Sequence, residues 1–284
     1  MRILIVFLLS TLFFTEVFSQ GKPAYKIYNL KGREVSYKKM VKTISKSDVV
    51  LFGEFHNNPI IHWLEYEVAS DLNLKRKLIL GAEMFETDNQ KEVNRYLNNE
   101  ISQKGLDTLA RLWSNYYTDY KPLLDFSKKN KLPFVATNIP RHFATKVYHE
   151  GLESLQELSD EDKKWIAPQP ILYDPTLPGY VKIKSMMGGH GGDNLPKAQA
   201  IKDATMANSI LKNWMQGSLF LHFNGSYHSD NFEGIYWYLK QHNSTIAIRT
   251  ISTVEQKNIK KIDKENKGKA DFMIVVPENM TKTF

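Results

Sequence analysis

Acidic residues and histidines recur in this chain just after short apolar runs. Glu54 and His56 follow one such run, Glu83 follows a second, and His228 follows a later one. In an open α/β sheet the carboxyl ends of the strands meet at one edge, and ligands bind in the crevice beyond them. Carboxylates beside imidazoles can ligate a metal ion or exchange protons with a substrate. These residues therefore predict a polar site at one edge of a sheet.

The spacing around two of these histidines repeats. Gly53–His56 and Gly225–His228 both have the pattern Gly-x-x-His, and both follow an apolar run. One copy is common by chance, and a histidine in a turn often only caps a helix or bonds to backbone. Two copies at expected strand ends, with Asn138 at another, favour a functional role.

The acids and histidines allow metal-dependent hydrolysis. His56, Glu83 and His228 form a plausible nitrogen and oxygen ligand set for zinc, manganese or iron. Glu54 and His56 are then the candidate catalytic residues, with Glu54 as the general base. Glu54 and Glu83, if they lie close together, would either share a proton or hold a cation. The structural alternative is that Glu54 caps a helix and Glu83 pairs with Arg141.

Two further features add polar groups near this site. His62 and Glu65 stand three residues apart, so they share one face of an expected helix. That spacing suits a metal ion, although it is also common on a solvated face. Arg141 lies just past an expected strand end, where it can pair with an acid or clamp a carboxylate ligand.

Strand and helix patterns alternate along the chain. Apolar runs predict strands at Val49–Phe52, Lys77–Phe85, Leu132–Thr137, Leu219–Phe223, Thr245–Ile251 and Phe272–Val276. Helical spacing predicts helices at Lys38–Ser47, Pro59–Leu72, Asn89–Leu97, Lys121–Lys129, His142–Glu150, Ala198–Trp214 and Phe232–His242. A short hairpin is expected from Tyr25–Tyr28 and Glu34–Tyr37. The alternation indicates an α/β fold with a mostly parallel β-sheet flanked by helices.

A stretch at about residues 152–197 interrupts this alternation. It contains a cluster of prolines and the glycine-rich run Met186–Gly192, and a single short helix at Asp160–Ile166 is expected within it. We therefore predict an irregular helical and loop insertion, or lid. Residues 20–284 are otherwise expected to form a single domain.

The first residues resemble an export signal. Arg2 precedes the apolar run Ile3–Phe14, and Val17–Ser19 offers a small-residue cleavage site. The apolar run is too short for a spanning helix, so residues 1–19 are predicted to be a signal peptide, with an uncleaved anchor as the alternative. The chain has no cysteine, which excludes disulfides, thiolate metal sites and a lipid-modified N-terminal cysteine.

The charge pattern argues against nucleic acid as a partner. The net charge is +7, but the lysines are scattered except at residues 257–269, where Asp263 and Glu265 interrupt the run. Such a run is typical of a solvated loop or hairpin. The sequence also lacks Gly-x-Ser-x-Gly, a phosphate loop and His-Glu-x-x-His, which excludes the enzyme classes that those motifs mark.

Five segments, in their order and spacing, resemble the ChaN family of bacterial haem-binding proteins, within the Tiki, TraB and erythromycin-esterase superfamily. They are Leu51–Glu65, Gly81–Glu86, Ala136–Arg141, Ala198–Ile210 and Gly225–His228. The resemblance implies an α/β fold, a role in haem or iron acquisition, a tyrosine haem ligand and haem held between two protomers. Two features depart from the family. Many members are lipoproteins, but this chain has no cysteine to acylate, and its last motif is closer to that of Tiki-like metallohydrolases.

This resemblance gives the histidines and tyrosines a second interpretation. The candidate haem-binding residues are His56, His62, Arg141, Tyr227 and His228. Tyrosinate is a hard donor that suits ferric iron, and the other candidate axial ligands are Tyr116, Tyr117, Tyr173 and Tyr180. Met186, Met187 and His190 in the glycine-rich run are further side chains that could approach a porphyrin. The alternative is that this run is only a mobile lid. No c-type attachment motif is present, so any haem is bound non-covalently.

Two main hypotheses follow. The first is an exported haem- or iron-binding protein of the bacterial cell envelope that acts in uptake. It would lie in the periplasm or at the outer membrane, with haem, a second copy of the chain and an outer-membrane haem or iron transporter as candidate partners. The second is a metal-dependent hydrolase that uses a divalent ion. A binding module for another anionic ligand is a third, simpler possibility.

Overall fold

The computed structural model describes residues 21–186 and 192–284 of the chain. The predicted signal peptide, residues 1–19, lies outside these ranges, as do Met187 and His190. Within the described residues, helices and strands alternate, and the ends of the strands set the positions of the candidate site residues.

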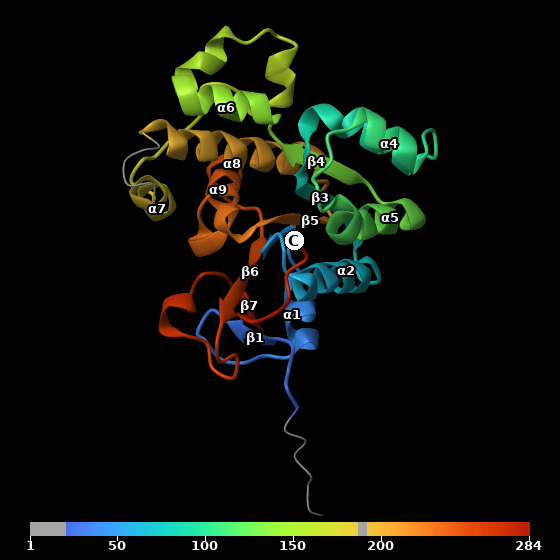
Figure 1. Ribbon diagram of the computed structural model, residues 1–284, viewed down its shortest axis with the longest axis vertical. Coiled ribbons are helices and arrows are strands. Elements are labelled where there is room, and N and C mark those ends of the chain that lie inside the picture. Colours follow the sequence, from blue (N-terminus) through green and yellow to red (C-terminus); the bar gives the residue numbers. More distant parts are fainter. Residues whose placement is uncertain (1–20, 187–191) are drawn as a thin grey trace, which may run out of the picture.

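Seven strands of the described chain form one sheet (Figure 1). Their order across it is β1-β7-β6-β2-β5-β3-β4, and β1 is antiparallel to β7 while the other neighbours are parallel. The strands are β1 Lys26–Asn29, β2 Val49–Glu54, β3 Lys77–Glu86, β4 Phe134–Asn138, β5 Ser218–Gly225, β6 Ile248–Gln256 and β7 Phe272–Pro277. The predicted mostly parallel α/β sheet is confirmed.

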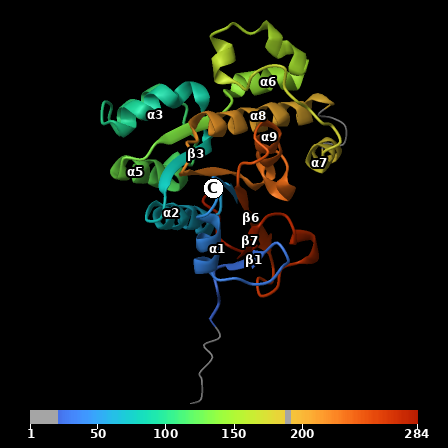
Figure 2. The ribbon, with the colours of Figure 1, turned by 180° about the vertical axis from the view of Figure 1, so that it is seen from behind.

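Helices cover both faces of this sheet, as Figures 1 and 2 show. They are α1 Tyr37–Ile44, α2 Pro59–Asn73, α3 Gln90–Leu97, α4 Gln103–Leu109, α5 Lys121–Asn130, α6 Arg141–Glu150, α7 Pro178–Met186, α8 Asn194–Asn213 and α9 Ile235–His242. Val50 and Phe52 of β2 pack in one core with α1, α2 and α5, whereas Val49 and Leu51 pack in another with α8 and α9. Because both faces are covered, β2 is apolar along most of its length and buried throughout.

The expected N-terminal hairpin forms only in part. Tyr28 makes a single antiparallel bridge to Glu34, and the Val35 N–H donates to the Ile27 carbonyl at 2.9 Å, while β1 pairs along its length with β7. The Ser36 hydroxyl accepts a hydrogen bond from the backbone N–H of Lys39 and thereby caps α1, which begins at Tyr37. Tyr37 is therefore helical rather than extended, because a serine cap favours helix initiation at this point.

The predicted lid region contains more helix than expected. It holds short 3-10 turns at Leu152–Glu157 and Asp162–Trp165, then α7, and α8 begins at Asn194 within the expected insertion. Apolar side chains of this region pack with those of α6 and α8 in a small core of their own. The single-domain boundaries and a lid role for residues 152–197 stay predictions. In the described ranges, none of the helices has both the length and the apolar character needed to cross a membrane.

Candidate functional site

Three neighbouring strands bring the candidate residues to one edge of the sheet. Glu54 ends β2, Glu83 lies near the end of β3, and Gly225 ends β5, which lies between them. The parallel register places Glu54 opposite Gly225. His56 and His228 follow within three residues of their strands, so both Gly-x-x-His motifs meet at the carboxyl edge of the sheet.

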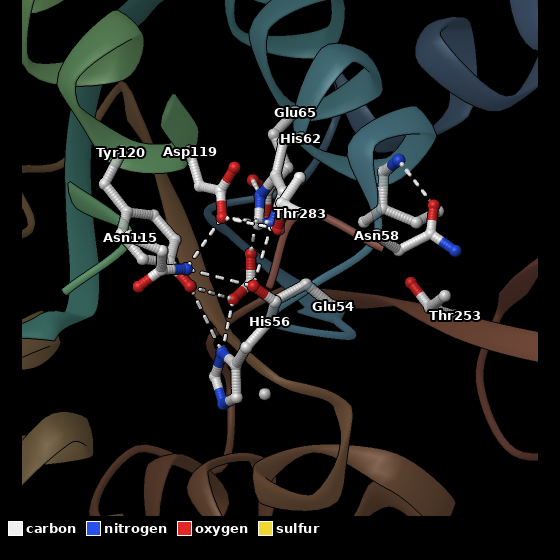
Figure 3. Close-up of polar contacts among 12 residues, drawn as sticks. Glu54, His56, Asn58, His62, Glu65, Asn115, Asp119, Tyr120, Thr253 and Thr283 are labelled. Carbon is white, nitrogen blue, oxygen red and sulfur yellow. Dashed lines mark hydrogen bonds and ion pairs between the residues drawn. The ribbon is translucent and has the colours of Figure 1, made fainter. Parts of the chain in front are cut away.

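Glu54 and His56 form a hydrogen-bonded pair at this edge (Figure 3). The Nδ1–H of His56 donates to Glu54 Oε1 at 2.5 Å, and the Tyr120 hydroxyl donates to the same oxygen at 2.8 Å. Burial opposes ionisation of Glu54, but the hydrogen bond from His56 and the nearby charge of His62 hold its pKa well below its usual range. Burial likewise opposes charge on His56, yet the Glu54 hydrogen bond and nearby Glu83 raise its pKa. Because Nδ1 is engaged, Nε2 is the ring nitrogen that can meet a ligand.

His62 lies behind this pair, on the buried face of α2. Its Nδ1 is 3.1 Å from Glu65 Oε2 and 3.3 Å from Glu54 Oε2. Its Nε2–H donates to the His56 carbonyl oxygen at 3.2 Å and lies 3.5 Å from Asp119 Oδ2. Burial lowers the pKa of His62, but the surrounding carboxylates outweigh it and raise the pKa to about 11. The face that carries His62 and Glu65 is therefore not solvated.

A second cluster surrounds His228. Its Nε2–H donates to Glu83 Oε1 at 3.1 Å and its Nδ1–H donates to Asp203 Oδ1 at 2.5 Å. Glu83 Oε2 also accepts the backbone N–H of Gly225 at 2.8 Å. Burial disfavours the imidazolium, but Glu83 and Asp203 together raise the pKa of His228 to about 10. Burial would raise the pKa of Glu83, and the charge of His228 lowers it to about 2 instead. This is a buried ion cluster.

Gly225 lets the two clusters come together. A Cβ atom at this position would lie 2.8 Å from His56 Nε2 and 3.6 Å from Glu83 Oε2. The His56 ring therefore occupies space that any other residue at 225 would fill. Because of this close approach, the second Gly-x-x-His motif requires glycine, which has no Cβ atom, at its first position.

Two pockets open on either side of His56. The first has a volume of about 850 Å³ and its lining includes Ile183, Leu195, Tyr227, His228 and Phe284. The second has a volume of about 770 Å³ and its lining includes Glu83, Trp113, Asn138, Arg141 and Lys202. Both volumes are typical of small-molecule sites. His56 and Phe284 line both pockets, so they form the wall between them.

The tyrosine candidates are not all brought to these pockets. Tyr227 is 41% exposed and lines the first pocket, where its hydroxyl donates to the Gly179 carbonyl at 3.1 Å. Tyr180 is buried and its hydroxyl donates to Asp203 at 3.2 Å. Tyr116 is buried beside α4, Tyr117 bonds to Asp107, and Tyr173 lines a separate pocket with Tyr180. Tyr227 is thus the tyrosine candidate that shares a pocket with His56.

The structural alternatives for the acids are not observed. Asn58, not Glu54, caps α2, because its side-chain oxygen accepts the N–H groups of Ile60 and Ile61. Glu83 pairs with His228 rather than with Arg141. Arg141 begins α6 with an exposed side chain and faces the second pocket.

Several site residues were missed from the sequence. Asp203 on α8 is 1% exposed and pairs with His228. The sequence feature that could have revealed it is an acidic residue among the apolar positions of a helix. Tyr120 and Asp119 follow no motif, and only the aromatic density around them set them apart. Phe284 offers no signal, because its role as a pocket wall depends on the tertiary path of the chain near Asn57.

The His228 cluster predicts a defined pH dependence of stability. The pKa of His228 in the folded protein, about 10, exceeds its ordinary value of 6.5. The contribution of His228 to stability is therefore complete below pH 6.5 and is lost as pH rises through about 10. The folded pKa of Glu83, about 2, lies below 4.5, so its contribution is complete above pH 4.5 and is lost as pH falls through about 2. When urea unfolding is measured from pH 3 to 10, the urea concentration at the midpoint should be highest between pH 4.5 and pH 6.5, where both contributions are complete. His228→Gln should reduce the alkaline decline, and an unchanged decline would contradict the assignment.

Comparisons with known proteins assign the chain to a family. The family model described as haem-binding uptake, Tiki superfamily, ChaN matches residues 40–239. The structure described as cofacial heme binding to ChaN of Campylobacter jejuni superposes with a TM-score of 0.67 at 18% sequence identity, covering 89% of this chain and 96% of that one. At that identity, the likeness shows a shared fold.

Two more distant proteins also match. A mutant erythromycin esterase in its open conformation is 10% identical with a TM-score of 0.46, over 88% of this chain and 83% of that one. The chloroplastic protein RETICULATA-RELATED 5 of Arabidopsis thaliana is 25% identical over 128 residues. That match covers 42% of this chain and 17% of the plant protein, so it spans less than a fifth of that curated relative.

Proposed function

Because the chain belongs to the ChaN family of haem-binding uptake proteins in the Tiki superfamily, we propose that it binds haem non-covalently in the first pocket. The observation that carries the proposal is the family match over residues 40–239, which includes both strand ends that position His56 and Glu83. The pocket beside His56 is the place in the described chain where a candidate tyrosine, histidine and apolar side chains occur together.

The residues of the first pocket fit a porphyrin. Ile183, Leu195 and Phe284 supply apolar surface for the ring faces in a pocket of about 850 Å³. Tyr227 offers a phenol oxygen and His56 an imidazole nitrogen, which are the donor types that hold haem iron in proteins. Bound haem would supply an iron centre for storage or transfer. The chain's own residues hold the iron, cover the ring and bind the propionates.

Tyr227 is the proposed iron ligand and His56 the second contact. Burial and the nearby acids Glu233 and Asp203 raise the pKa of Tyr227, so its phenol is protonated before haem arrives. To hold ferric iron, a hard cation, the phenol of Tyr227 would have to release that proton. His56 is held in one orientation by Glu54, which presents its Nε2 to the wall between the pockets.

Arg141 and Lys202 line the second pocket, on the far side of the wall that His56 and Phe284 form. We propose that the propionates of haem in the first pocket extend past this wall to these two side chains. Arg141→Ala should weaken hemin binding about fivefold, the effect of one solvent-exposed ion pair of ~1 kcal/mol. The effect should shrink as salt rises, because exposed pairs are screened. A hemin titration at low and high salt measures both. Lys146→Ala, on the same helix but paired with Glu150, is the matched control; an equal loss in both variants would exclude a specific role for Arg141.

We further propose that the protein is exported, acts in haem or iron uptake in the bacterial envelope, and associates with a second copy and an outer-membrane transporter. Mass spectrometry of the protein from fractionated cells tests export, since processing after Ser19 and recovery from the periplasm or outer membrane are expected. Full-length protein in the cytoplasmic fraction would overturn the proposed export.

Sedimentation with and without hemin tests the proposed dimer, which should form or strengthen when hemin is added.

One observation favours a second candidate function. The Glu54–His56 pair resembles the carboxylate–imidazole pairs that orient a general base, and His56 lies beside the metal candidates Glu83 and His228. Glu54 is buried behind His56, so in a hydrolase the imidazole would exchange the proton and Glu54 would orient it. Chelator-sensitive hydrolysis of an ester or peptide library, lost in His56→Ala, would support this alternative. Hemin binding without such activity supports the first.

A further inference from the structure

We propose that Glu54, His62 and Glu65 form a buried binding site for one divalent transition-metal ion, behind the wall of the haem pocket. His62 and Glu65 line neither of the two pockets beside His56, whereas Glu54 also lines the first pocket. They come from one face of α2, while Glu54 comes from the end of β2 (Figure 3). The proposal does not rest on haem binding, so each can fail without the other.

The donor atoms converge on one point. Each residue offers one ligand atom, and these atoms lie within 4.8 Å of one another. His62 Nδ1 is 3.3 Å from Glu54 Oε2 and 3.1 Å from Glu65 Oε2. Ligands at about 2.1 Å from a shared ion are separated by about 3.0–3.4 Å at octahedral or tetrahedral angles. The observed separations therefore match a ligand set that needs little rearrangement.

Unpartnered buried oxygens point to a missing cation. Glu54 Oε2 and Glu65 Oε1 have no hydrogen-bond partner among the described residues, although both side chains are fully buried. Buried polar atoms in native proteins nearly always have a partner, and an orphaned carboxylate oxygen is costly. Both orphaned oxygens belong to glutamates of the proposed site, and a carboxylate can bind an ion through either or both of its oxygens.

The charges around these oxygens leave an excess of acid. Glu54, Glu65 and Asp119 are buried together, and within the described chain their ion pairs are with His56 and His62 alone. No lysine or arginine of that part of the chain compensates them. Three buried acids therefore face two histidines, and a bound dication would supply positive charge for the remaining acid.

The surroundings of His62 also suit a metal ligand. Its Nε2–H donates to the His56 carbonyl, with Asp119 3.5 Å away, so Nδ1 is the nitrogen that faces the two glutamates. Metal-binding histidines commonly donate the other ring N–H to a carbonyl or carboxylate in this manner. Glu54 Oε1 is held by Tyr120 and His56, which leaves Oε2 for the ion.

The donor set indicates the class of ion. One imidazole and two carboxylates suit Zn²⁺, Mn²⁺ or Fe²⁺ better than Mg²⁺, which prefers oxygen ligands and retained water. Three protein ligands leave a position for water or a further ligand. Since Glu54 contacts both His62 and His56, the ion would be linked through one carboxylate to the wall of the pockets.

The test is a Zn²⁺ titration of the purified, chelator-treated chain without a histidine tag, followed by calorimetry. A second sample is refolded with Zn²⁺, dialysed and assayed for metal, because the site is buried. One ion per chain is expected. Glu65→Gln, which keeps the side-chain shape, should weaken Zn²⁺ binding at least about tenfold. Glu67→Gln is the matched control, since Glu67 lies on the same helix outside the cluster.

Each outcome decides the proposal. Loss in Glu65→Gln with retention in Glu67→Gln supports it. Loss in His228→Gln with retention in Glu65→Gln assigns the ion to the other cluster and overturns it. No ion in either sample means that protons balance these carboxylates, and also overturns it. X-ray absorption of the wild-type zinc complex needs no variant: one imidazole among oxygen ligands supports the site, and two imidazoles contradict it.

Discussion

Replacing Tyr227 with phenylalanine is expected to weaken hemin binding by at least about 100-fold, since even residues outside the ligand shell can cost 10–100-fold in metal affinity. The substitution removes one oxygen and keeps the ring, so the packing of the first pocket should survive. Of the five tyrosine candidates, Tyr227 is the one that lines the pocket with His56. Absorbance titration gives both the affinity and the position of the Soret band, and the band should shift because the iron ligand changes.

A matched control removes a similar hydroxyl elsewhere. Tyr117 is also well exposed, but its hydroxyl bonds to Asp107 and it lines neither pocket beside His56. Tyr117→Phe should therefore leave both affinity and spectrum unchanged. Wild-type affinity and an unshifted band in Tyr227→Phe would show that another residue holds the iron. His56→Ala would then be the next variant to examine.

Glu83→Ala should cause the largest loss of stability, about 3–5 kcal/mol in the free energy of unfolding, because the substitution removes one partner of a buried ion pair. His228 and Glu83 are each less than a tenth exposed, and in the variant Asp203 would be the one acid left to pair with the His228 ring. The backbone N–H of Gly225 would lose its acceptor as well. Urea unfolding at pH 7 measures the change.

Glu86→Ala provides the comparison for this prediction. Glu86 lies three residues further along β3 and pairs with the exposed Arg111. A surface pair contributes at most about 1 kcal/mol, so this variant should be only slightly destabilised. Equal losses in the two variants would mean that the His228 cluster does not hold a buried charge.

The positions of the strands, and hence of the site, were predictable from the sequence. Apolar runs followed by Glu54, Glu83 or Gly225 marked three strand ends, and parallel pairing brings such ends to one edge. The hairpin of Tyr25–Tyr28 with Glu34–Tyr37 was predicted correctly only at its bridge between Tyr28 and Glu34. Residue type alone did not reveal that β1 pairs with β7, a strand more than 200 residues away.

The contacts within the site were less predictable. The spacing of His62 and Glu65 showed a shared helix face, but not that this face is buried against Glu54 and Asp119. Asp203 binds His228 from a helix 25 residues earlier in the chain. Which acid pairs with which base depends on the packing of α8 and α2 against the sheet, and a sequence pattern does not encode those distances.

We expect this chain to bind haem in the first pocket, which His56 and Tyr227 line, and a hemin titration of the purified chain followed by absorbance tests this directly. A saturable, shifted Soret band with an end point near one haem per chain, and its loss on Tyr227→Phe, is the predicted result. A linear increase that matches free hemin, with no saturation, would contradict the claim and leave the metal-dependent hydrolase as the function to test.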